Sequence, residues 1–145
     1  MNQDYNYILD SLPYQDPFLF VDELISVSNE TCEGKYRFLE DAFFYKGHFK
    51  NHPVTPGVII TECMAQIGVV CLGIFILKDS LAATPQLALS SHTVDFYKPV
   101  YPGETVTVLS EKHYFRFQKL QCAVKMLNEK GELVAKGTIS GMVSH

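Results

Sequence analysis

The sequence VIITECMAQIGVVCLGIFIL, residues 58–77, is a long apolar run that contains a single charged residue, Glu62. Its length matches the ~20 residues that a helix needs to cross a bilayer. A carboxylate is costly in lipid, however, and no basic cluster marks a cytoplasmic flank. A helix that is apolar on all sides is equally typical of the centre of a soluble domain. We therefore expect a buried helix from about residue 56 to residue 77, and no membrane span.

The segments on either side of this run have the alternating pattern of β-strands. In one of them, Leu120, Cys122 and Val124 fall on the same face. One long apolar helix packs most economically against an antiparallel sheet that bends around it. The sequence therefore predicts an α+β fold in a single domain, residues 1–145. Two strands are expected before the helix and four after it: residues 18–27, 33–39, 87–99, 104–118, 119–127 and 133–143.

Composition places the chain among ordinary globular proteins. It has 145 residues, of which 47% are hydrophobic and 19% charged, and a formal net charge of −4. The acidic balance argues against nucleic-acid binding, which needs a basic face. The N-terminal residues are polar and acidic, without the basic-then-apolar order of a signal peptide, so we expect a cytoplasmic protein. The four cysteines have irregular spacing, which favours reduced, core-packed thiols.

The residues at the expected start of the helix form a candidate oxyanion site. Thr55 is a good N-cap, and Pro56 suits the first helical position. If the Thr55 side chain accepts the N–H of Val58, the N–H of Gly57 stays free at the positive end of the helix dipole. Gly57 has no side chain, so a carbonyl oxygen that gains negative charge can approach it. Gly57 and Val58 are therefore candidate substrate-binding residues.

Two polar side chains near this start are candidates for catalysis, and a third is a candidate to orient one of them. Glu62 and Gln66 lie one turn apart on the same helix face, so the amide can hydrogen-bond the carboxyl group and orient it. A carboxyl group in so apolar a setting can give a proton to a leaving oxygen. His48 precedes the helix on a segment held by Pro53 and Pro56, which is a suitable place for a general base.

Other roles for these side chains are open at this point. His48 can be a core histidine bonded to a backbone carbonyl, and Glu62 can pair with a lysine or arginine elsewhere in the chain. His48, His52 and Glu62 can also ligate a metal. The HxxxH spacing resembles a helical metal pair, but Pro53 directly after His52 disfavours a helix there, so we expect no metal.

Three motifs give the chain a resemblance to a known family. Residues 47–66, GHFKNHPVTPGVIITECMAQ, resemble the pattern GHFPxxPxxPGVxxxEAxAQ of the hot-dog-fold β-hydroxyacyl-[acyl carrier protein] dehydratases of the FabZ/FabA type. Residues 12–22, LPYQDPFLFVD, are similar to the family's LPHRxPFLxVD, and residues 94–104, VDFYKPVYPGE, to its FxxPVxPGD. Departures from the family include Lys50, where it has proline, Asn51, where it has a small residue, and Tyr14-Gln15, where it has His-Arg.

The resemblance implies a hot-dog fold, in which an antiparallel sheet wraps around one long central helix. It implies a hydro-lyase that converts a β-hydroxyacyl thioester to the trans-2-enoyl thioester in fatty-acid or related acyl-chain biosynthesis. By the same resemblance, His48 removes the proton next to the thioester carbonyl and the Gly57 N–H stabilises the enolate-like oxygen. Glu62 then assists loss of the β-hydroxyl as water.

The resemblance also implies partners. The substrate is carried on the phosphopantetheine arm of acyl carrier protein, and no cofactor is needed. In the family, the histidine and the glutamate of one site come from different subunits, so we expect a homodimer with shared sites or a trimer of such dimers. Lys46 and Lys50, beside His48, are candidates for a basic patch that receives an acidic carrier.

Two other functions are compatible with the same residues. The hot-dog fold also hosts acyl thioesterases, which hydrolyse the thioester. A non-catalytic acyl-binding hot-dog subunit is the second alternative, which the presence of both His48 and Glu62 disfavours.

Overall fold

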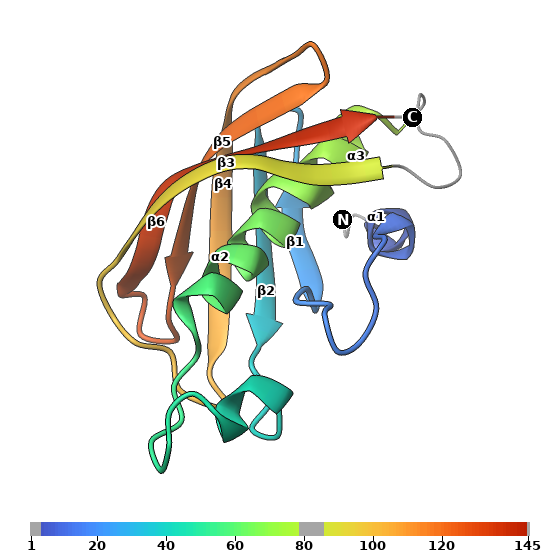
Figure 1. Ribbon diagram of the computed structural model, residues 1–145. Coiled ribbons are helices and arrows are strands. Elements are labelled where there is room, and N and C mark those ends of the chain that lie inside the picture. The colour runs from blue at the N-terminus through green and yellow to red at the C-terminus, as the bar shows by residue number, and fades with distance from the viewer. Residues whose placement is uncertain (1–3, 79–85, 145) are drawn as a thin grey trace.

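Six antiparallel strands form one sheet that wraps around a long central helix (Figure 1). The computed structural model describes residues 4–78 and 86–144. The strand order in the sheet is β1-β2-β4-β5-β6-β3, and every neighbouring pair is antiparallel. This arrangement confirms the predicted α+β hot-dog fold. The strands are β1 (Glu23–Val27), β2 (Thr31–Arg37), β3 (Gln86–Phe96), β4 (Thr105–Arg116), β5 (Lys119–Leu127) and β6 (Leu133–Ser144).

The central helix consists of three consecutive parts. These are α2 (Gly57–Ala65), a π-helical stretch η2 (Gln66–Cys71) and α3 (Leu72–Ile76). By length and composition the helix could cross a membrane, but 83% of its most apolar window is buried inside the fold. It is therefore the core helix, as predicted, and its bounds differ from the prediction by one residue at each end.

Two glycines allow the helix and the sheet to approach each other closely. A Cβ atom on Gly68 would lie 2.9 Å from Val124 Cγ1 and 3.1 Å from Ser110 Cβ. A Cβ atom on Gly34, in β2, would lie 2.9 Å from Ile67 Cγ2. Because protein interiors are close-packed, any larger residue at either position would push the helix away from the strands.

The strand faces that meet the helix are apolar, as the alternation predicted. Leu120, Cys122 and Val124 of β5 are at most 3% exposed. All four cysteines are buried and unpaired, which confirms the expectation of core-packed thiols. Burial raises the pKa of Cys32 and of Cys122 to about 12, so both thiols stay protonated and unreactive near neutral pH.

The N-terminal part of the chain differs from the sequence expectation. Asn6–Ser11 form a helix, α1, which the polar composition did not predict, and the fully buried Ile8 packs it against the core. The first strand begins at Glu23 rather than at residue 18. The reason is that the Phe20 N–H donates to Gln66 Oε1, at 2.8 Å, and not to a neighbouring strand. The segment before β1 is therefore attached to the central helix.

Candidate active site

The central helix begins at Gly57, with Pro56 rather than Thr55 at the N-cap position. The predicted Thr55 cap is wrong, because the buried Thr55 hydroxyl is hydrogen-bonded with the Tyr45 hydroxyl instead. No side chain caps this helix start, and within residues 4–78 and 86–144 neither the Gly57 N–H nor the Val58 N–H has an acceptor. Both donors are therefore available at the positive end of the helix dipole.

Gly57 borders an open cleft of about 330 Å³. The Phe96 ring lies over Gly57, so that a Cβ atom there would be 3.3 Å from Phe96 Cζ. The absence of a side chain thus keeps a narrow space between the helix start and an aromatic wall. The cleft is lined by Thr55, Gly57, Ile60, Phe96, Tyr97, Lys98 and Pro99.

His48 lies on the loop between a 3₁₀ turn, η1 (Phe43–Lys46), and the helix start. Its Nδ1 is 2.9 Å from the Val54 carbonyl oxygen, and the Val54 N–H donates to the His48 carbonyl at 3.0 Å. Since a carbonyl oxygen only accepts, Nδ1 carries the proton, and the lone pair of the neutral ring is on Nε2. His48 therefore makes the hydrogen bond to a backbone carbonyl that a purely structural histidine would make. This bond orients the half-buried residue and still leaves Nε2 available as a base.

Glu62 is half-buried on the helix, and the predicted hydrogen bond from Gln66 is present: Gln66 Nε2 lies 2.9 Å from Glu62 Oε2. Gln66 is fully buried and also donates to the Phe18 carbonyl at 3.1 Å. In the described part of the chain, no lysine or arginine forms an ion pair with Glu62. The amide, and not a cation, therefore holds this carboxyl group.

The carboxyl group lines a second cavity, of about 220 Å³. Tyr14 lines it too, a residue that the sequence marked only as a departure from the family pattern. His48 and Gly57 are not among the residues of this wall, so one chain presents the predicted site residues in two places, the helix start and the cavity. The wall consists of Tyr14, Phe18, Glu62, Ala65, Val69, Val70, Leu87, Ala88, Leu89, Gly141 and Met142.

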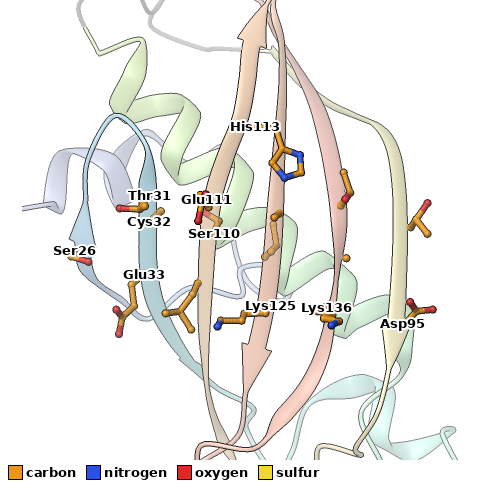
Figure 2. A pocket seen from close by; sticks show the side chains of 16 residues that line it. Ser26, Thr31, Cys32, Glu33, Asp95, Ser110, Glu111, His113, Lys125 and Lys136 are labelled. Carbon is orange, nitrogen blue, oxygen red and sulfur yellow. The ribbon is translucent and has the colours of Figure 1, made fainter.

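A larger hollow, of about 900 Å³, lies on the sheet face that points away from the helix (Figure 2). Glu33, Lys125, Lys136 and Asp95 cross it in one row of the sheet. None of the predicted site residues lines this hollow, and its charges are mixed. We therefore place the candidate site at the helix, because the predicted site residues lie there, although the hollow on the outer sheet face is larger.

Among the residues that the structure describes, no three His, Cys, Asp or Glu side chains come together as a metal would require.

The three sequence motifs meet at the central helix. In the motif of residues 94–104, the Val100 carbonyl accepts the Thr55 N–H at 2.9 Å. In the motif of residues 12–22, the main chain of Phe18 binds Gln66. The motif of residues 47–66 supplies the helix start itself, so the three segments assemble one structural unit around it.

A family model described as a FabA-like domain matches residues 12–140. The chain belongs to this family. Among similar proteins, the 3-hydroxyacyl-[acyl-carrier-protein] dehydratase FabZ of Thermus thermophilus is 34% identical over 142 residues, which are 94% of each chain. The protein of the same name from Paramagnetospirillum magneticum is 33% identical over 144 residues, which are 97% of this chain and 86% of the relative.

Solved structures agree on the fold of this FabA-like chain. The dehydratase heterocomplex ApeI:P from Xenorhabdus doucetiae has a TM-score of 0.79 at 14% identity, with coverage of 95% of this chain and 91% of the other. A hypothetical thioesterase from Streptococcus pneumoniae, solved with coenzyme A, has a TM-score of 0.63 at 12% identity, with coverage of 97% and 94%. At such identities the likeness concerns the fold alone, which hosts both reactions.

Proposed function

We propose that this chain dehydrates a β-hydroxyacyl thioester on acyl carrier protein to the trans-2-enoyl thioester, in fatty-acid or related acyl-chain biosynthesis. The observation that carries the proposal is the position of Glu62, a carboxyl group held by Gln66 on the wall of a largely apolar cavity. Such a cavity suits an acyl chain, and a carboxyl group there can act on a hydroxyl that the chain carries. The names of the FabZ relatives support the same chemistry.

In the proposed reaction, His48 Nε2 takes the proton from the carbon next to the thioester carbonyl. The C–H electron pair moves toward the carbonyl oxygen, which the N–H groups of Gly57 and Val58 stabilise. The pair then forms the C=C bond as the β-carbon–oxygen bond breaks, and protonated Glu62 gives its proton to the departing hydroxyl, which leaves as water. Return of the proton from His48 to Glu62 through solvent restores the starting state.

We also propose that a second copy of the chain completes the site. His48 does not line the cavity of Glu62 in one chain. Strand β3 is an edge of the sheet, paired only with β6, and Leu89 and Phe96 on it are each 49% exposed. Pairing of two β3 edges would cover these side chains and set the helix start of one chain beside the Glu62 cavity of the other. The resulting assembly is a homodimer with shared sites, which either exists by itself or forms part of a trimer of dimers.

The proposed test is incubation of the purified chain with β-hydroxyacyl carrier proteins of several lengths, followed by mass spectrometry. Loss of one water from the loaded carrier is the expected result. Release of the free carrier thiol without enoyl product would identify a thioesterase instead. A carrier substrate that binds and stays unchanged would identify a non-catalytic acyl-binding subunit.

A further inference from the structure

Tyr14 supplies the second polar side-chain group on the wall of the Glu62 cavity. A phenol and a carboxyl group therefore share a space of about 220 Å³ whose other walls are apolar. The remaining lining residues are Phe18, Ala65, Val69, Val70, Leu87, Ala88, Leu89, Gly141 and Met142.

Both polar groups have unused hydrogen-bonding capacity. Within residues 4–78 and 86–144, the Tyr14 hydroxyl has no hydrogen-bond partner, and no bond joins it to Glu62. Gln66 donates a hydrogen bond to Glu62 Oε2, while Glu62 Oε1 accepts none from any described residue. Two unpartnered polar groups on the wall of one cavity can both bind an oxygen of a ligand that enters it.

The Tyr14 phenol is a hydrogen-bond donor across the neutral range. Burial is the first cause that raises the pKa of Tyr14 to about 12, and the charge of Glu62 in its ionised form is the second. Tyr14 and Glu62 line the same cavity. A neutral phenol can donate to an oxygen whose negative charge grows as a bond breaks.

The segment that carries Tyr14 shares its anchor with the carboxyl group. Gln66 accepts the Phe20 N–H at 2.8 Å, donates to the Phe18 carbonyl at 3.1 Å and donates to Glu62 at 2.9 Å. The buried Gln66 side chain thus holds both the segment that carries Tyr14 and the Glu62 carboxyl group. Such preorganisation is what a site needs to hold a small leaving group.

From this geometry we propose that the Tyr14 hydroxyl binds the β-oxygen of the substrate, opposite Glu62, and holds it while it leaves as water. This inference rests on the proposed dehydration and assigns it a further residue. As the carbon–oxygen bond breaks, its electron pair stays on the oxygen and the proton of Glu62 is transferred to it. The product water then accepts from Tyr14 and donates to the Glu62 carboxylate. Tyr14 thereby favours hydroxylated acyl chains over saturated ones.

The variant Tyr14→Phe tests this role because it removes only the hydroxyl. We expect a kcat about tenfold lower, the effect of one hydrogen bond to a developing charge. Ligand binding is compared by calorimetry in the His48→Ala background, with 3-hydroxyoctanoyl-pantetheine and octanoyl-pantetheine as probes. The background protein should bind the hydroxylated probe more tightly, and addition of Tyr14→Phe should make the two affinities equal.

Two further variants control this comparison. Tyr14→His keeps an N–H donor and should retain part of the preference for the hydroxylated probe. Tyr36→Phe removes a partly buried phenol that does not line the cavity, and should change neither turnover nor preference. If Tyr14→Phe does not fold, Tyr14→His carries the test, with retained preference supporting the proposal and lost preference overturning it.

The outcomes separate this proposal from the proposed function. Unchanged turnover and unchanged preference in folded Tyr14→Phe protein would overturn the role of Tyr14 and leave it as a cavity wall. A background protein that binds neither probe, or both equally, would overturn it as well. A wild-type chain that dehydrates no substrate would refute the proposed function, while the binding comparison would still decide whether Tyr14 recognises a hydroxyl.

Discussion

Gln66 Nε2 donates a hydrogen bond of 2.9 Å to Glu62 Oε2 and so fixes the carboxyl group on the helix face that lines the apolar cavity. The amide is fully buried, and its other bonds go to the main chain of Phe18 and Phe20. Gln66 is therefore a positioning residue, which couples the orientation of the carboxyl group to the packing of the segment before β1.

Replacement of this amide by an apolar side chain of similar size should damage both stability and turnover. In Gln66→Met, the Phe20 N–H and the Phe18 carbonyl lose their partner, and each buried unpaired group costs about 1–3 kcal/mol. We expect a fall of about 2 kcal/mol or more in the free energy of unfolding, measured in urea, and at least tenfold slower dehydration.

A matched control is Gln121→Met, since Gln121 is a partly exposed amide bonded to Ser140 and lies outside the cavity wall. It should cost less than Gln66→Met, about 1 kcal/mol, because only one buried group, the Ser140 hydroxyl, loses its partner, and it should leave turnover unchanged. Equal stability of the two variants would show that the buried amide is not the anchor.

His48 and Glu62 should each be essential, and should complement each other between chains. His48→Ala and Glu62→Gln remove the proposed base and acid, so each should lower turnover by about 10²-fold or more. Since the site is shared in the proposed dimer, mixing the two variants and allowing subunit exchange should restore part of the activity. Full activity of either variant alone would contradict the assignment, and absence of recovery in verified heterodimers would place both groups in one chain.

The helix start offers a substitution that removes a donor and spares the fold. Gly57 is the first helical residue, a position that favours proline, and Pro56 before it already has the extended backbone (φ −60, ψ 140) that a following proline requires. Gly57→Pro should therefore keep its melting temperature while turnover falls by about 10²-fold, because the N–H is lost.

Gly57→Ala is the control, because it keeps the N–H and brings only a Cβ atom to 3.3 Å from the Phe96 ring. Its loss of turnover should be smaller than that of the proline variant. Normal turnover by folded Gly57→Pro protein would exclude this N–H as the oxyanion donor.

The continuous apolar run predicted the helix because almost all of its sides are buried, and alternation predicted the strands because each of them buries one apolar face. Local rules failed where the fold offered a competing partner. Thr55 has the propensity of an N-cap, yet its hydroxyl is hydrogen-bonded with the Tyr45 hydroxyl instead. Helix α1 was missed because a single buried residue, Ile8, gives no periodic signal in a polar segment. Tyr14 lines the cavity of Glu62 on a segment that Gln66 binds at positions 46 and 48 residues away, and no local pattern contains such contacts.

The hairpin between β4 and β5 should be open to stabilisation. Arg116 pairs with Lys119, so the turn consists of Phe117 and Gln118, which have φ values of 52° and 65°. Two positive φ angles in a two-residue turn favour Asn-Gly, and Phe117 is 92% exposed. Phe117→Asn with Gln118→Gly should raise the free energy of unfolding by about 1 kcal/mol without a change in turnover. Lower stability of the double variant would mean that the phenyl ring contributes contacts in the assembled protein.

Lys46 and Lys50 are both exposed, at the end of η1 and on the loop after His48. Neither takes part in an ion pair in the described part of the chain. The chain as a whole carries −4, so an acidic carrier would be repelled elsewhere and attracted here.

Reversal of these two charges should separate carrier binding from chemistry. Lys46→Glu with Lys50→Glu should raise KM for a carrier-bound substrate and spare a substrate on neutral pantetheine, because only the carrier contacts the patch. The wild-type KM for the carrier form should also rise with salt, since exposed charges are screened over about 8–10 Å. Lys125→Glu with Lys136→Glu, on the sheet face that points away from the helix, is the matched control for net charge. Equal rises in KM for both substrates would show that Lys46 and Lys50 shape the site itself. Equal changes of KM in the two double variants would show that only the net charge of the protein matters, and not the position of the patch.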